Sequence, residues 1–120
     1  MSALSYNCRG LGSDATIREI VDFAKHFKPT VFCVLETQLH KIWVERLAGR
    51  LGYDRSFAVS STGRSGGLGI FWNNEINVTI LPYSQYHLDA IITERVVNPG
   101  GLPVFMVRLG RRRDSKLGIC

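Results

Sequence analysis

The most informative stretch of the chain is Thr30–Leu35, which reads TVFCVL and runs directly into Glu36. It is short, rich in β-branched residues and apolar without alternation. A strand with one solvated face alternates apolar and polar residues, whereas a strand covered on both faces does not. We therefore predict a buried strand here. Any helix before it should end at Lys28-Pro29, because proline disfavours the helical conformation in the residue before it.

The segment before this strand predicts a shorter strand and then a helix. Ala3–Asn7 is a strand candidate that ends at the glycine-containing turn Cys8–Gly12. Apolar residues then recur at helical spacing from Ile17 to Phe27, with charged residues on the other face. Asp14 is the predicted N-cap of this helix.

The segment after the buried strand changes from alternating elements to consecutive strands. A second helix is expected over about Lys41–Leu51. Further strands are expected over Ser56–Ser60, Leu68–Trp72, Ile76–Leu81 and Leu88–Thr93. The order β-α-β-α followed by consecutive strands predicts an α/β or α+β layered fold with a mixed sheet and two helices.

Length and composition are those of one globular domain or less. The chain has 120 residues, 45% of them hydrophobic and 21% charged, which is too apolar for a disordered protein. No apolar run approaches the roughly 20 residues of a membrane helix, and no signal peptide is apparent. Cys8, Cys33 and Cys120 form no C-x-x-C pair, so neither a zinc site nor a disulfide framework is predicted. We expect a soluble intracellular protein.

Positive charge is concentrated near the C-terminus. The net charge of the chain is +5. Five basic residues, less Asp114, account for +4 of it: Arg108, Arg111, Arg112, Arg113 and Lys116. We place the end of the regular domain at residue 95, before a Pro/Gly-rich breaker cluster, and assign 96–120 to a divergent, poorly ordered basic tail. This tail is either a solvated charge run or a contact for an anionic partner.

Two polar residues stand at the ends of predicted strands. Asn7 ends the first strand, and Glu36 follows the buried one. If these strands are parallel neighbours, their carboxyl ends share one edge of the sheet, where sites in such sheets form. A carboxylate and a carboxamide there could hold a hard divalent cation. The alternative is that both are ordinary loop residues.

The glycine-rich segment Gly63–Gly69 is not a nucleotide P-loop. It lacks the G-x-x-x-x-G-K-[ST] spacing, and a strand follows it instead of a helix. A tight connection is the better interpretation, in which Arg64 could still meet a phosphate. His26, His40 and His87 show no metal-ligand spacing.

Four blocks of the chain resemble the endonuclease domain of plant LINE-type (non-LTR) retrotransposons. They are YNCRGLG at 6–12, KPTVFCVLET at 28–37, SGGLGIFW at 65–72 and HLDA at 87–90. The resemblance covers about residues 3–94. Such domains belong to the endonuclease/exonuclease/phosphatase superfamily, whose fold is a four-layer α/β sandwich.

The resemblance implies Mg²⁺-dependent hydrolysis of phosphodiesters in DNA, and therefore a nuclear protein. It implies that Glu36 binds the metal and that Asn7 helps to arrange the metal and the scissile phosphate. It implies no small-molecule cofactor and no membrane. Arg64 and the basic residues of the tail are the predicted nucleic-acid contacts.

The sequence also departs from the family pattern. The later Tyr, Asp-x-Asn and Asp-His blocks are not recognisable, and His87 and Asp89 belong to an earlier block. We therefore expect a truncated domain, the N-terminal part of the sandwich, that lacks a general base and is inactive as this chain. The alternatives are a non-catalytic nucleic-acid-binding or relic fragment, and a phosphatase of the same superfamily.

A missing second sheet would have an energetic consequence. The inner apolar face of the first sheet would be left open, and each large side chain left wet forgoes about 1.5–3 kcal/mol. A few such residues would offset a typical net stability of about 5–15 kcal/mol. This reasoning predicts a marginally stable or aggregation-prone chain.

Overall fold

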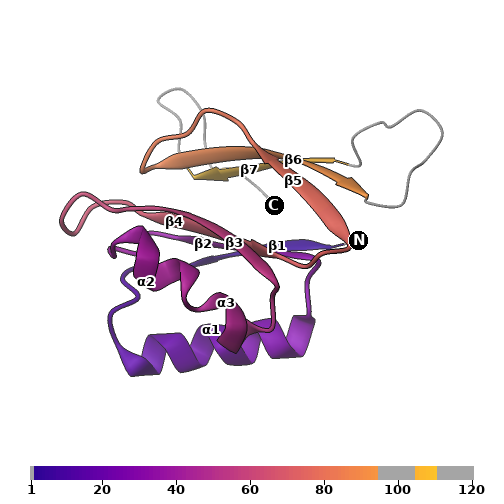
Figure 1. Cartoon of the computed structure of the whole chain (residues 1–120). Coiled ribbons are helices and arrows are strands. Elements are labelled where there is room, and N and C mark those ends of the chain that lie inside the picture. The colour runs from indigo at the N-terminus through magenta and orange to yellow at the C-terminus, as the bar shows by residue number, and fades with distance from the viewer. Residues whose placement is uncertain (1, 95–104, 111–120) are drawn as a thin grey trace.

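The computed structural model describes residues 2–94 and 105–110. The strands are β1 (Ala3–Asn7), β2 (Val31–Leu35), β3 (Arg55–Val59), β4 (Leu68–Trp72), β5 (Ile76–Ile80), β6 (His87–Glu94) and β7 (Phe105–Gly110). The helices are α1 (Asp14–Phe27), α2 (Lys41–Glu45) and α3 (Ala48–Leu51). Figure 1 shows them in three layers, with the helices below one sheet and a second sheet above it.

The first sheet has the order β1-β2-β4-β3. The β1 and β2 strands are parallel and joined through α1, and the register pairs Asn7 with Leu35. The β4 strand runs antiparallel to both β2 and β3. The predicted mixed sheet is thus confirmed, and β1 and β2 end at the same edge.

The β2 strand is buried on both faces, as its unbroken apolar pattern predicts. Phe32 and Val34 face the helices, in a core that also holds Ile20 of α1. Val31 and Cys33 face the second sheet. Successive side chains of a strand point to opposite faces, so each face of this sheet carries its own core.

Two details of the helices differ from the predictions. Ser13, not Asp14, caps α1, because the Ser13 hydroxyl accepts a hydrogen bond from the Thr16 N–H. Asp14 lies in the first turn, where its charge interacts favourably with the helix dipole. The predicted helix over residues 41–51 is divided into α2 and α3, since the Leu47 N–H bonds to the Val44 carbonyl and tightens the turn between them.

The second sheet has the order β5-β6-β7 and covers the inner face of the first. Its strands contribute the buried residues Leu88, Ile92 and Leu109 to the core between the sheets. The prediction of an open apolar face was therefore wrong, and with it the argument for marginal stability.

The β7 strand lies beyond the predicted domain boundary at residue 95. Residues 105–110 fall within the predicted basic tail, but they pair with β6, and Val107 and Leu109 are buried. Buried Val107 and Leu109 alternate with exposed Met106 and Arg108, so the apolar face of this strand reaches the core. The rest of the predicted tail lies outside the described residues. No helix in the described part is long and apolar enough to cross a membrane.

Candidate functional site

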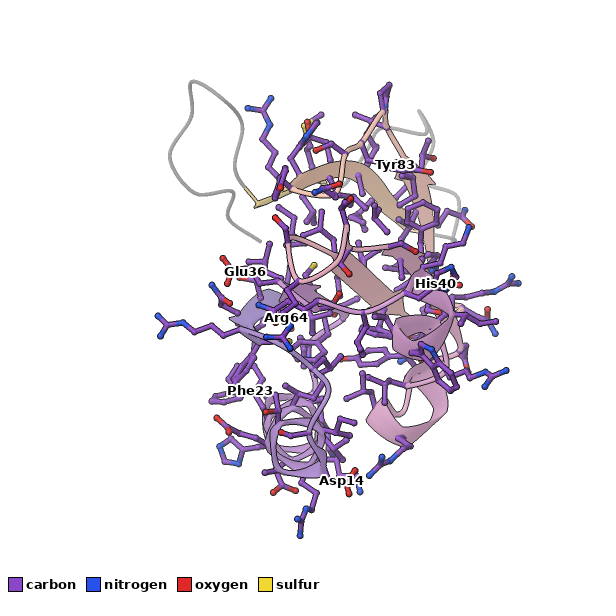
Figure 2. The ribbon with its side chains drawn as sticks, turned by 90° about the vertical axis from the view of Figure 1, so that its left-hand side faces the viewer. Asp14, Phe23, Glu36, His40, Arg64 and Tyr83 are labelled. Carbon is purple, nitrogen blue, oxygen red and sulfur yellow. The ribbon has the colours of Figure 1, made fainter. Side chains whose placement is uncertain are left out.

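Asn7 and Glu36 meet at the edge where β1 and β2 end. Both line one small pocket of about 80 Å³ between the two sheets. Leu35 of β2 also lines the pocket, and three further segments contribute the remaining residues: Gly66, Leu68, Gln85, Tyr86 and Gly110. Figure 2 looks onto this end of the molecule, where Glu36 is labelled. The predicted pair is thus brought together.

Backbone hydrogen bonds hold the Glu36 loop from both sides. On the β1 side, Cys8 N–H donates to Leu35 O (2.9 Å) and Gly10 N–H donates to Glu36 O (2.8 Å). On the β4 side, Gln38 N–H donates to Gly66 O (3.0 Å). The pairing of β2 with its neighbours therefore continues past the end of the strand and fixes the position of Glu36.

The backbone of this loop is in an unusual conformation. Glu36 has φ +54° and Gln38 has φ +56°, values in the left-handed region that non-glycine residues rarely occupy. Thr37 lies between them and is fully buried, while Glu36 is exposed. Such strain costs on the order of 1–3 kcal/mol per residue and persists only where the surroundings enforce it. The result is a carboxylate held outward on a rigid loop.

The side chains of Asn7 and Glu36 differ in their hydrogen bonding. The Asn7 Oδ1 accepts a hydrogen bond from the Arg9 N–H (3.1 Å), which leaves the NH₂ group of the same amide to face a ligand. Within residues 2–94 and 105–110, no hydrogen bond or ion pair engages the Glu36 carboxylate. An uncompensated carboxylate beside an oriented amide is suited to binding a cation and an anion together.

Glu36 and Asn7 could contribute to a divalent metal site, but they could hold the ion only in part. Mg²⁺ is often bound by one or two carboxylates, with water and phosphate oxygens completing its octahedron. Glu36 could supply the carboxylate. Among the residues that the structure describes, no cluster of three or more His, Cys, Asp or Glu side chains could hold a metal alone. Water or ligand oxygens would therefore have to complete the coordination.

The opposite wall of the pocket was not predicted from the sequence. Gln85 and Tyr86 lie in the connection before β6, and Gly67 N–H donates to Gln85 O (2.9 Å). No local pattern marks these two residues, because a Gln-Tyr pair before a strand resembles any turn. They join the site only because the second sheet packs on the first.

Two of the predicted nucleic-acid contacts, Arg64 and Arg108, are among the described residues, and neither lines the pocket. Arg64 and Arg108 are both exposed. Each stands two residues before a glycine of the pocket wall, Gly66 and Gly110 respectively. The other predicted nucleic-acid contacts, Arg111, Arg112, Arg113 and Lys116, lie outside the described residues.

The cysteine next to Asn7 is not a nucleophile at neutral pH. Cys8 is buried, and burial raises the pKa of its thiol to about 12. The negative charges of Glu19 and Glu36 also raise this pKa, while a hydrogen bond with the Leu35 backbone lowers it. Because the thiolate is the reactive form, Cys8 acts as a small apolar core residue.

Comparison with known proteins agrees with this geometry. The model of the Endonuclease/Exonuclease/phosphatase family matches residues 4–117, which include β7. No curated protein matches the chain. Fold, site and match lead to one conclusion: this chain belongs to the Endonuclease/Exonuclease/phosphatase family.

Proposed function

We propose that the chain is a Mg²⁺-dependent phosphodiesterase domain of the retrotransposon DNA-endonuclease type, which binds metal and a phosphodiester but does not hydrolyse it alone. The observation that carries this proposal is that Asn7, at the end of β1, and Glu36, on a loop held from both sides, line one pocket. DNA as the ligand implies that the domain acts in the nucleus.

Each residue of the pair has a separate role in this proposal. Glu36 would hold the metal, and the Asn7 amide would donate to a non-bridging oxygen of the phosphate. When bound, Mg²⁺ neutralises charge on the phosphate and on the leaving oxygen. The absence of turnover follows from the rest of the pocket. Among its described lining residues there is no His, Asp or second Glu that could activate water.

Metal binding can be tested without any enzymatic readout. Mn²⁺ is a paramagnetic substitute for Mg²⁺ and broadens the NMR signals of nearby amides. We expect broadening centred on Asn7 and Glu36 that Glu36→Gln abolishes. The matched control is Glu75→Gln, an exposed carboxylate in the turn between β4 and β5. Uniform broadening, or broadening that survives Glu36→Gln, would contradict the assignment of Glu36.

A plasmid-nicking assay with Mg²⁺ tests the predicted lack of turnover. We expect supercoiled plasmid to remain intact with the wild-type chain. Nicking that disappears in Glu36→Ala would show that the chain is an active nuclease and that a water-activating group was overlooked.

A non-catalytic nucleic-acid-binding module is the second candidate. It is favoured by the exposure of Arg64 and Arg108, which precede Gly66 and Gly110 of the pocket wall by two residues each. Phosphate contacts of this kind weaken steeply with salt. We expect a truncation after Gly110 to weaken DNA binding and reduce its salt dependence. The cut must spare Arg108–Gly110, because these residues are part of β7.

A further inference from the structure

Tyr86 is an exposed aromatic residue in the wall of the Asn7/Glu36 pocket. The residue is 49% exposed and lines the pocket. It faces the same pocket as Leu35 and Leu68, which add apolar surface beside the two polar residues.

The position of Tyr86 is built by several contacts. The Tyr86 hydroxyl and the Ser65 hydroxyl are 2.6 Å apart and share a hydrogen bond. The Tyr86 N–H donates to Ser84 Oγ (3.1 Å). The neighbouring Gln85 is held by its carbonyl, which accepts from Gly67 N–H, and by its side chain, which accepts from the Thr62 hydroxyl. The ring is therefore pre-organised, not a loose surface side chain.

Two glycines pack against the Tyr86 segment, where a side chain at either position would be too close to it. A Cβ at Gly66 would lie 3.2 Å from the Tyr86 ring and 2.7 Å from the Gln85 carbonyl oxygen. A Cβ at Gly110 would overlap the Tyr86 carbonyl. Both glycines also have positive φ, +74° and +86°. Strand β7 and the β3–β4 connection thus both approach Tyr86 as closely as backbone allows.

The arrangement suits a ligand with a charged phosphate and a flat apolar ring. At about 80 Å³ the pocket is far smaller than the roughly 300–1,000 Å³ of sites that enclose a ligand. A ring would therefore lie across its mouth, against Tyr86. Stacking of bases on aromatic side chains is the usual way to bind single-stranded nucleic acid without reading its sequence.

We propose that Tyr86 is a stacking platform for a nucleobase next to the phosphate bound at Asn7 and Glu36. This inference rests on the proposed phosphodiester site, and it names the ligand as a nucleic acid with an unpaired base at that point. Simple phosphate esters without a base would make no stacking contact with Tyr86.

The test compares two oligonucleotides of equal charge by fluorescence anisotropy in low salt with Mg²⁺. One is a labelled single-stranded octathymidylate, and the other is an octamer of abasic residues. We expect the base-containing strand to bind about ten-fold more tightly, a factor within the range measured for loss of one base stack. Tyr86→Ala should bring the ratio of the two affinities to about one, whereas Tyr86→Phe should preserve it.

The matched control is Tyr83→Ala. Tyr83 is equally exposed, at 50%, but it packs on Phe57 and does not line the pocket. We expect the wild-type ratio in this variant, and circular dichroism checks that every variant is folded.

Three results would overturn the proposal. Equal affinity of the wild-type chain for both strands would remove the base platform but leave the phosphodiester site standing. A ten-fold ratio that persists in Tyr86→Ala would place the stacking elsewhere. Failure to bind either strand would overturn the proposed function as well.

Discussion

Thr37 shows how single residues control the candidate site. It is fully buried between two residues with positive φ, and its hydroxyl has no hydrogen-bond partner among the described residues. Its N–H donates to Gly67 O (3.2 Å), and its carbonyl accepts from Leu11 N–H (2.9 Å). Thr37 therefore anchors the loop from within, so that Glu36 can point outward.

Gly67 is predicted to be essential to this anchor. It has φ +94°, and a Cβ there would overlap the Thr37 hydroxyl. We expect Gly67→Ala to lower the free energy of unfolding by about 2–6 kcal/mol, since backbone strain and steric overlap add. The control is Gly63→Ala, with φ +59° and open space, for which about 1–2 kcal/mol is expected. Urea denaturation measures both, and equal losses would contradict a close Gly67–Thr37 contact.

Because of Tyr53, we predict that the free energy of unfolding varies with pH in the alkaline range. Its hydroxyl donates to Pro29 O (2.7 Å), and burial raises its pKa from 10.0 to about 12. The unfolded state therefore loses the proton first, so stability is complete below about pH 10 and falls as pH rises towards 12. Tyr53→Phe should cost about 1 kcal/mol at pH 7 and make this fall shallower. An unchanged slope in pH-dependent urea titrations would contradict the assignment.

Strand β7 shows what an element contributes beyond its own sequence. Phe105–Gly110 follows a breaker cluster and leads into an arginine run, so its local context suggests a tail. Its register with β6 instead places Val107 and Leu109 in the core between the sheets. It also brings Gly110 to the pocket wall. This element therefore completes both the core and the candidate site.

Paired substitutions in β7 test whether it belongs to the fold. Leu109 is 1% exposed, and Leu109→Ala should destabilise the protein by about 2–5 kcal/mol through lost burial and a cavity. Met106 is 45% exposed, and Met106→Ala should change stability by no more than about 0.5 kcal/mol. Thermal and urea denaturation give both values. If Leu109→Ala were as mild as its control, β7 would not be part of the folded core.

At the scale of the whole molecule, the first sheet is shared by two cores. Phe32 and Phe71 pack against the helices, while Cys33 and Ile70 of the same strands pack against the second sheet. If either the helix layer or the second sheet detached, the apolar face of the first sheet that it covers would be exposed to water. The layers should therefore unfold together.

This coupling predicts one cooperative unfolding transition. The two tryptophans report on different layers, Trp43 from α2 and Trp72 from β4. We expect tryptophan fluorescence of the Trp43→Phe and Trp72→Phe variants and far-UV circular dichroism to give coincident urea transitions, the signature of two-state unfolding. Transitions separated between the two probes would show that the helix layer and the sheets unfold independently.

Local patterns in the sequence determined the elements and half of the candidate site. The unbroken apolar run of β2 predicts burial on both faces, and the parallel β1–β2 pair places Asn7 and Glu36 at one edge. These features depend on neighbouring residues, whose periodicity is directly visible in a sequence.

The tertiary structure alone decided the remainder. Tyr86 and Gly110 are 24 residues apart, yet they share the pocket wall with Asn7. No local pattern records such a meeting, because it results from the burial of one sheet against another. Whether Phe105–Gly110 is a tail or a strand was settled in the same way, by the apolar face of the first sheet that it helps to cover.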